Sequence, residues 1–292
     1  MTFIKLIFLI FFSISLNFNA AAEDIFDASK GGRLEIVKQM IQDDPDIVFA
    51  KDSFGDTCLH KASAYDHEMI VKEILKQKKI DIDAVNDNNE TCLFLAARFG
   101  SYNIFKFLIE KGADYLILDK DDNTILHAAA MSKHNDSSAI AMFIINKFIK
   151  EMTNDNGIDI NQKNVMGMTP LHIASKSGNN ETAKILIQNG SNINAKDKLS
   201  RTGLHWAAEG GKFVLVKTLI NNNISINLTC INKRSALHLA VIANRVNIVK
   251  YLLANGADFK LLDNNGKTPL RIALEHNHRQ IIDLLVMQGA LE

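Results

Sequence analysis

Proline and cysteine are both scarce in this chain of 292 residues, which contains three of each. The few prolines argue against Pro-rich linkers between domains. The cysteines include no Cys-x-x-Cys pair, which excludes zinc-ribbon and thioredoxin-like motifs. The sequence also has no Gly-rich phosphate loop, Gly-x-Ser-x-Gly elbow or paired-carboxylate signature. We therefore expect no catalytic residues, no metal and no cofactor.

An excess of charge of either sign is missing as well. Thirty-three basic residues balance 33 acidic ones, so no pooled positive field is expected to attract nucleic acid or an anionic membrane. With 47% apolar and 23% charged residues, the composition suits one or two globular domains. Neither nucleic acid nor a membrane is an expected partner of such domains.

The first 22 residues differ sharply from the rest of the chain. An apolar stretch over residues 6–16 follows Lys5, and three alanines occupy residues 20–22. A positive start, an apolar segment of about 7–15 residues and a small-residue exit are typical of a secretory signal peptide. We expect residues 1–22 to be cleaved and the mature protein to be secreted or periplasmic, without stable membrane insertion. The alternative is an uncleaved segment that anchors the protein in a membrane.

One short phrase, Thr-x-Leu-His or a close variant, recurs along the chain at nearly constant intervals. The seven copies begin at Thr57, Thr91, Thr124, Thr169, Thr202, Ser235 and Thr268. The intervals between them are 34, 33, 45, 33, 33 and 33 residues. A fixed period in this range indicates a repeat architecture.

Each copy of the phrase belongs to a unit with the same internal plan. A turn rich in Asp or Asn precedes the Thr, and a first helix with Leu and Ala at helical spacing follows it. A Gly or Asn ends that helix, and a second helix with an apolar face completes the unit, as in residues 247–258. Two short helices cannot bury their apolar faces alone, so neighbouring units must stack.

On these residues the sequence resembles the ankyrin-repeat family, whose signature is a 33-residue unit with Thr-Pro-Leu-His-x-Ala. A degenerate first unit precedes Thr57, with Ala28, Gly32 and Val37 at the pattern positions. The resemblance implies an all-α solenoid of stacked helix-turn-helix units, joined by β-turn or hairpin loops. It divides residues 23–292 into eight units, which start near residues 23, 52, 86, 119, 164, 197, 230 and 263.

The unit between Thr124 and Thr169 contains twelve extra residues. We predict that its second helix is lengthened to about Met152 and that a polar loop follows, from Thr153 to Gly157. We expect a tolerated surface insertion, with a functional protrusion as the alternative.

Five histidines occupy the same place in their units, and these are His60, His127, His172, His205 and His238. In the ankyrin family this residue forms structural hydrogen bonds between the turn and the adjacent unit. Recurrence favours the same role here, because a catalytic base is usually unique. Equivalent residues of successive units also lie too far apart to share a metal ion with bonds near 2 Å.

The three cysteines have different expected environments. The resemblance places Cys58 and Cys92 at equivalent positions of adjacent units, beyond the Cα separation of roughly 7 Å that a disulfide allows. We expect both to be small buried side chains. Cys230 lies in a turn and is the better candidate for an exposed thiol.

The resemblance implies that partners bind to the concave face and to the hairpin tips. The positions concerned lie just before the Thr and seven and eight residues after it. Apolar, aromatic and Arg residues there are typical of interfaces. The candidate partner-binding residues are Phe54, Tyr65, Phe99, Met131, Val165, Met166, Met168, Leu199, Arg201, Ile231 and Ile242. The alternative for any one of them is packing against a neighbouring turn, and Trp206 is expected to pack at least as much as it binds.

These features predict a non-enzymatic, exported and monomeric protein that binds an unidentified protein partner, as an adaptor or a host-directed effector. One alternative is an inhibitory, immunity-type partner of a co-exported enzyme. A second is an enzyme whose site is hidden in the repeats. The lack of a non-repeated acid, base and nucleophile argues against that second alternative.

Overall fold

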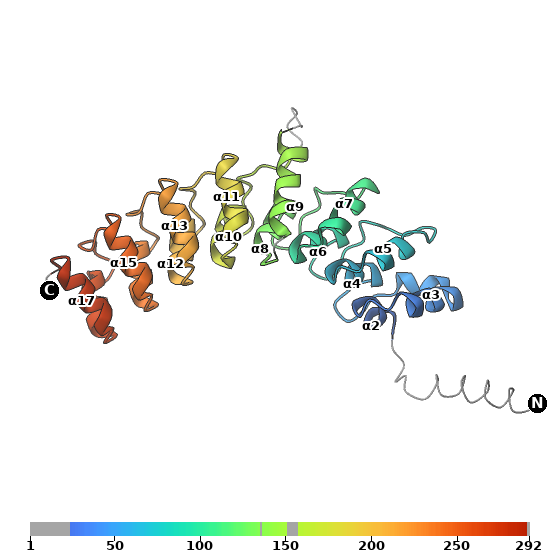
Figure 1. Ribbon diagram of the computed structural model, residues 1–292, viewed down its shortest axis with the longest axis horizontal. Helices are drawn as coiled ribbons and strands as arrows, with labels where there is room; N and C mark the ends of the chain where they lie inside the picture. The colour runs from blue at the N-terminus through green and yellow to red at the C-terminus, as the bar shows by residue number, and fades with distance from the viewer. Residues whose placement is uncertain (1–23, 135, 151–156, 291–292) are drawn as a thin grey trace, which may run out of the picture.

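The computed structural model describes residues 24–134, 136–150 and 157–290. Within these ranges the chain forms pairs of antiparallel helices that stack in sequence along a curved row (Figure 1). This arrangement confirms the expected all-α solenoid. The predicted signal segment and residues 151–156 of the insertion lie outside the described residues.

The first helix of each pair lies on the concave side of the row and is called the inner helix (Figure 1). The inner helices are α2 (Ile25–Lys30), α4 (Cys58–Ala64), α6 (Cys92–Phe99), α8 (Ile125–Met131), α10 (Pro170–Ser177), α12 (Gly203–Glu209), α14 (Ala236–Ile242) and α16 (Pro269–Glu275). The outer helices are α3 (Leu34–Asp43), α5 (Glu68–Ile74), α7 (Tyr102–Glu110), α9 (Ser137–Ile144), α11 (Asn180–Gln188), α13 (Phe213–Asn221), α15 (Val246–Ala254) and α17 (Arg279–Met287). Pairs are numbered as units 1 to 8, and a 3₁₀ turn, η1 (Pro45–Phe49), follows α3.

The repeated phrase explains where each inner helix begins. In α4, Thr57 is the N-cap: its hydroxyl accepts a hydrogen bond from the backbone N–H of His60. The Nδ1 atom of His60 accepts in turn from the N–H of Thr57 at 3.1 Å. This reciprocal capping box satisfies two N–H groups that a helix start otherwise leaves unpaired. Where Phe94 or Arg271 replaces the histidine, only the Thr half of the box is present.

Small residues allow neighbouring inner helices to approach closely. Buried alanines line their contact faces, among them Ala96, Ala129, Ala174, Ala207 and Ala240. Larger aliphatic side chains from the outer helices fill the space behind them, as Leu108, Leu186 and Leu252 do. The result is one continuous apolar core that runs through all eight units.

The insertion extends the outer helix of unit 4. Helix α9 continues as a π-helical segment, η2 (Ile145–Lys150). Ile145 and Phe148 of this segment are buried, and so is Ile158 beyond it. The Phe148 ring stacks on Tyr115 with a centroid separation of 3.9 Å. The described part of the insertion is therefore packed onto the solenoid through its own apolar contacts.

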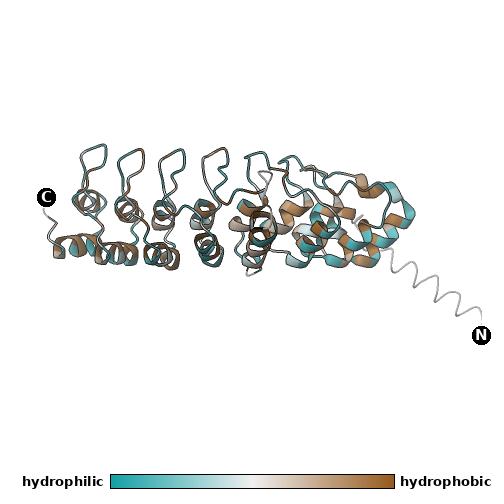
Figure 2. Ribbon diagram, turned by 90° about the horizontal axis from the view of Figure 1, so that it is seen from above, coloured by the Kyte–Doolittle hydropathy of each residue, from teal (hydrophilic) through white to brown (hydrophobic). Residues whose placement is uncertain are grey.

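Loops project from one edge of the solenoid as a row (Figure 2). Each loop, here called a finger, is defined as the eight residues before the repeated Thr or Ser and takes the number of the unit it leads into. The fingers are 49–56, 83–90, 116–123, 161–168, 194–201, 227–234 and 260–267, numbered 2 to 8.

An Asp or Asn at the fourth position stiffens most fingers. In finger 6, the Oδ1 atom of Asp197 accepts hydrogen bonds from the N–H groups of Leu199 and Arg201, both at 2.8 Å. The same pair of bonds forms at Asp52, Asn86, Asp119, Asn164 and Asp263. Such side-chain turns replace the regular backbone pairing that a short loop lacks.

Backbone hydrogen bonds also join successive fingertips. The N–H of Lys198 donates to the carbonyl of Met166 at 3.0 Å, and the N–H of Ile231 donates to the carbonyl of Leu199 at 2.9 Å. Equivalent bonds connect every neighbouring pair from finger 2 to finger 8. The fingers therefore form one continuous row. In the part of the chain that the structure describes, no helix has the length and apolar character needed to cross a membrane.

Candidate protein-binding surface

The recurring histidines connect each unit to the next. The Nδ1 atom of His172 accepts from the N–H of Thr169, so its Nε2 atom carries the proton and donates to the carbonyl of Arg201 at 3.0 Å. His60, His127, His205 and His238 donate in the same way to the eighth residue of the next finger, at 3.0 to 3.3 Å. These bonds confirm the expected structural role of the histidines.

Burial lowers the pKa of all five histidines. For His127 and His205 it lowers the pKa from 6.5 to about 4, against the opposing effect of the carbonyl that each ring contacts. The imidazoles are therefore neutral at neutral pH. Both of their nitrogens are occupied by backbone partners, which leaves no free lone pair for catalysis or for a metal ion.

The fingertips present the most exposed apolar side chains of the candidate set. Phe54 is 67% exposed, Ile231 61% and Met166 51%. Leu199 and Val165 are exposed as well. The apolar tips are adjacent only in fingers 5, 6 and 7, because the tips of fingers 3, 4 and 8 carry polar residues. An exposed apolar row of this kind is typical of a protein-binding surface.

The concave side places the remaining candidates nearer to the inner helices. Tyr65 and Phe99 are exposed at the ends of α4 and α6. Each ring lies beneath a cation, Lys30 over Tyr65 and Arg98 over Phe99. Met131 and Ile242 are half-buried at the ends of α8 and α14 and pack against the core.

Arg201 takes part in a network around Trp206. The guanidinium lies 4.6 Å from the centre of the Trp206 ring and forms an ion pair with Glu209 at 2.7 Å. Lys176 of unit 5 lies near the same ring, 5.1 Å from its centre. The indole N–H of Trp206 donates to Asp197 at 2.9 Å. These residues connect units 5 and 6 and form part of the concave surface at the base of finger 6.

Two residues lie deeper than the sequence suggests. Met168 is only 4% exposed and belongs to the core, so its side chain is not on the candidate surface. It occupies the eighth finger position, where the side chain turns inward, and its carbonyl accepts from both Asn164 and His127. Cys230 was expected to be exposed, and this prediction is wrong, because the residue is 6% exposed. Cys230 occupies the fourth position of finger 7, where the other fingers have an Asp or Asn whose side chain lies beneath the fingertip.

The other two cysteines are buried and free, as expected. Burial raises the pKa of the Cys58 and Cys92 thiols to about 12. Thiols of this kind are not nucleophilic at neutral pH, because the thiolate is the reactive form.

The charge of the finger row has a strong polarity that the balanced total conceals. Fingers 2 to 4 contain eight acidic residues and two basic ones, whereas fingers 5 to 8 contain eight basic residues and two acidic ones. The two acidic residues of fingers 5 to 8, Asp197 and Asp263, are buried at 8% and 4% exposure. The exposed charge of these four fingers is thus entirely positive. Counting charge finger by finger, instead of over the whole chain, would have found this feature in the sequence.

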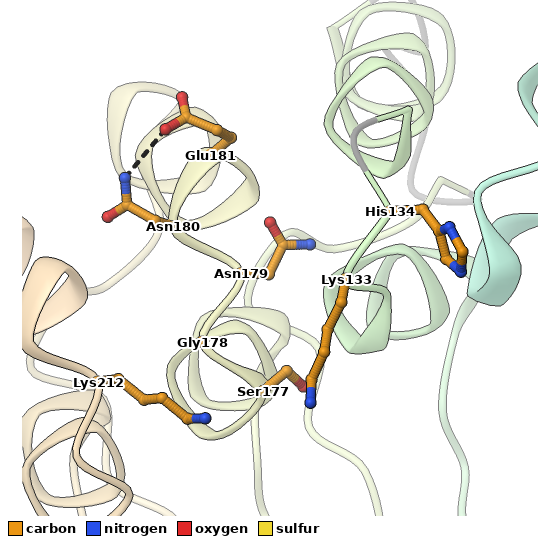
Figure 3. Close-up of a pocket in the computed structure, with 8 residues that line it drawn as sticks. All are labelled: Lys133, His134, Ser177, Gly178, Asn179, Asn180, Glu181 and Lys212. Atoms are coloured by element: carbon orange, nitrogen blue, oxygen red, sulfur yellow. Dashed lines mark hydrogen bonds between the residues drawn. The ribbon is translucent and has the colours of Figure 1, made fainter.

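A pocket of about 570 Å³ lies on the edge opposite the fingers, between units 4 and 6 (Figure 3). Its walls are Lys133, His134, Ser177, Gly178, Asn179, Asn180, Glu181 and Lys212. Lys133 and Lys212 extend toward Ser177 and Gly178 from the two sides, while the His134 ring is turned away from Ser177 (Figure 3). The His134 imidazole is therefore not placed to act as the general base of a nucleophilic Ser177.

The hydrogen bonds that the Asn179 side chain forms at this pocket have a structural role. Its amide N–H donates to the carbonyl of Ser132 at 2.8 Å and to the hydroxyl of Ser137 at 3.1 Å. These contacts connect unit 5 to unit 4 next to the insertion. Within the described ranges, no group of three or more His, Cys, Asp or Glu side chains is arranged to hold a metal ion.

Curated relatives contain the same repeat in longer chains. The chain is 31% identical over 133 residues to the human transient receptor potential cation channel subfamily A member 1, a match covering 46% of this chain and 11% of the channel subunit. It is 31% identical over 140 residues to a putative ankyrin repeat protein of fowlpox virus, FPV228, covering 44% and 26%. It is 28% identical over 171 residues to the nuclear factor NF-kappa-B p105 subunit of Rattus norvegicus, covering 57% and 16%.

The matched region spans less than a third of the length of each of these relatives. What they share with this chain is the repeat. The family model for ankyrin repeats (3 copies) matches residues 25–119, 115–197 and 204–291, which together cover nearly all of the described solenoid. The helix pairs, the histidine bonds and this match agree, and the chain belongs to the ankyrin-repeat family.

Proposed function

We propose that this protein acts without catalysis, as a binding module that holds a protein partner against its fingers and the concave ends of its inner helices. Ankyrin repeats imply a role in protein–protein interaction. The observation that carries the proposal is the row of exposed apolar side chains on the fingertips. Hydrogen bonds to the backbone groups of these residues fix the tips, so the fold does not require apolar side chains there.

Rigidity of the row supports this role. Each fingertip is hydrogen-bonded to its neighbour, and the fourth-position Asp or Asn holds the loop from within. A pre-organised surface loses little conformational entropy when a partner binds. Apolar and aromatic anchors on such a surface are the side chains that carry most binding energy at interfaces.

The location in which the module acts is also a proposal. Residues 1–22 have the composition of a secretory signal, and we propose that they direct export to a secreted or periplasmic location. Export is compatible with an adaptor, a host-directed effector or an inhibitor of a co-exported enzyme, and the identity of the partner would separate these roles.

Affinity capture with matched variants tests the binding surface. The full chain is used as bait in the compartment from which it is recovered, and captured proteins are identified by mass spectrometry. One bait carries Tyr65→Ala with Phe99→Ala, and a second carries Met166→Ala with Leu199→Ala. The control carries Val214→Ser with Met287→Ser on outer helices α13 and α17, where both side chains are exposed.

At least one of the two surface variants is expected to lose the captured partner, while the control keeps it. Unchanged capture by both surface variants, or loss by the control alone, would contradict the proposed surface. Circular dichroism of all three baits checks that the helical content is unchanged.

A further inference from the structure

We infer that fingers 5 to 7 bind an acidic polypeptide segment in which carboxylates alternate with apolar side chains. This inference rests on the proposed function and specifies the chemistry of the partner. Two features coincide on these fingers. The tips are apolar, at Val165, Met166, Leu199 and Ile231, and the exposed charge around them is positive.

The apolar part of the surface is continuous. Met166 and Leu199 occupy the sixth position of fingers 5 and 6, and Ile231 occupies the fifth position of finger 7. Backbone bonds between Lys198 and Met166, and between Ile231 and Leu199, hold these three tips side by side. A partner that crosses them can bury apolar side chains on three consecutive units.

The positive charge is available to a partner. Lys198 and Lys233 stand beside the apolar tips, are exposed, and form no ion pair with any residue that the structure describes. Two other cations of these fingers already have partners: Arg201 pairs with Glu209, and Arg234 pairs with Asp263 at 3.2 Å. Because Asp197 and Asp263 are buried, nothing on these tips competes with an incoming carboxylate.

The long-range field favours the same partner. Residues 157–290 contain sixteen basic and eight acidic residues, whereas residues 24–150 contain sixteen basic and twenty-one acidic residues. An acidic segment is therefore attracted to the C-terminal fingers and repelled from fingers 2 to 4. Specificity for one end of the solenoid follows from this difference.

Nucleic acid and an anionic membrane share the negative charge but fit the surface less well. Single-stranded nucleic acid is held by aromatic side chains that stack on bases, and fingers 5 to 8 contain no aromatic residue. Interfacial membrane binding commonly uses Trp or Phe anchors, which the same fingers lack. The apolar tips instead suit Leu, Ile or Phe side chains of a polypeptide.

A second copy of the chain is a weaker fit. Its acidic fingers 3 and 4 carry Asn88 and Asp121 at the tip position, which offer no apolar side chain to Met166 or Leu199. In finger 2, the apolar Phe54 is present, but Asp52 and Asp56 are already paired with Lys61, each at 2.7 Å.

Peptide selection on the full chain tests the inference. A phage library of random dodecapeptides is panned on the immobilised protein, and enriched peptides are synthesised with a fluorophore for anisotropy titration. The first variant carries Lys198→Glu with Lys233→Glu, and the second carries Leu199→Ser with Ile231→Ser. The controls are Lys120→Glu, at the position of finger 4 equivalent to Lys198, and Val214→Ser, on the exposed face of outer helix α13.

Enriched peptides are expected to combine Asp or Glu with apolar residues. Each double variant should weaken their binding at least about tenfold, each control by less than about twofold, and binding should weaken as salt is raised from 50 to 300 mM. Trp206 fluorescence and circular dichroism confirm that the variants are folded. The inference is overturned if no peptide is enriched, if the enriched peptides are neutral or basic, or if the double variants bind them normally.

Three further measurements test whether a membrane, a nucleic acid or a second copy of the chain binds to the same surface. The protein is tested for cosedimentation with vesicles of 70% phosphatidylcholine and 30% phosphatidylserine, and for a gel shift of a 20-nucleotide single strand. If either kind of binding is present and is lost in the Lys198 and Lys233 variant, the surface is assigned to membrane or to nucleic acid instead. A dimer in sedimentation velocity that the same variant abolishes would assign it to self-association. If protein capture still depends on Tyr65 and Phe99 while peptide binding fails, the proposed function stands and only this inference falls.

Discussion

Acid is expected to weaken the solenoid through its buried histidines, well above the pH at which carboxylates titrate. The pKa of His127 and His205 falls from 6.5 in a solvated chain to about 4 in the folded protein. The unfolded chain therefore binds protons at these residues below pH 6.5, while the folded chain does not bind them until near pH 4. Stability is complete above pH 6.5 and is lost as the pH falls toward 4.

The size of the effect follows from the shift. One pKa unit corresponds to about 1.4 kcal/mol, so each of these two histidines costs roughly 2 kcal/mol of stability at pH 5 and roughly 3 kcal/mol below pH 4. His60, His172 and His238 contribute with the same sign. A domain's net stability is commonly about 5–15 kcal/mol, so the loss should be easily measured.

His127→Phe isolates one contribution, because Phe94 already occupies the same position in unit 3. At pH 8 the variant loses the bond to Met168 and leaves the N–H of Thr124 without its acceptor, at a cost of about 1–3 kcal/mol. At pH 5 the gap between the two proteins should narrow by roughly 2 kcal/mol, since phenylalanine does not titrate. Urea unfolding at pH 8, 6.5 and 5, followed by circular dichroism, measures the gap.

An unchanged urea midpoint of the wild-type protein between pH 8 and pH 5 would contradict a destabilising role of the buried histidines in acid. So would a gap that stays constant over the same range. Most carboxylates titrate below this window, because their ordinary pKa values lie near 4. Burial raises the pKa of Asp66 and Asp83, but both residues are present in the two proteins, so they leave the gap between the proteins unchanged.

Three further outcomes are expected. Gly167→Ala should destabilise the protein by at least about 1 kcal/mol more than Gly266→Ala in urea unfolding, because a Cβ at Gly167 meets the backbone nitrogen of Lys198 at 2.9 Å while one at Gly266 meets nothing within 4 Å. Both glycines have φ near 70°, at 72° and 69°, so equal losses would contradict a rigid contact between fingers 5 and 6. All three cysteines should resist a disulfide reagent at pH 8 until urea is added, and one fast-reacting native thiol would show that Cys230 is not buried as described. Terminal sequencing of protein from the secreted or periplasmic fraction should begin near Glu23, and an intact Met1 would instead favour an anchored form.

Much of the fold could be predicted because the repeated phrase recurs at a period that can be read directly from the sequence. In five inner helices the Thr or Ser at the start recurs together with a histidine three residues later, and in unit 5 the two bond to each other and to the next unit. Recurrence also distinguished structural histidines from catalytic ones, since five identical environments indicate a structural role. The single irregular interval predicted a lengthened outer helix in unit 4, and the structure describes this helical extension as far as Lys150.

What the sequence left undecided depends on which way a side chain turns within a finger. Met168 and Met166 are two residues apart in the same turn, yet one is 4% exposed and the other 51% exposed. Met168 lies at the eighth position, where its carbonyl accepts from His127 of the previous unit, whereas Met166 lies at the sixth position, which forms the tip. Cys230 is buried for a related reason: the fourth position lies beneath the tip in every finger. These are tertiary constraints that neither composition nor spacing expresses.

Site-specific photo-crosslinking shows directly whether a protein partner lies against the fingers and the inner helices. A photoreactive phenylalanine is placed at Phe54, Phe99 or Leu199 on that surface, and at Val214 on the outer helix α13, which is 62% exposed. The captured partner is expected to be crosslinked from at least one of the three surface positions and not from Val214. Crosslinking from Val214 alone would contradict it.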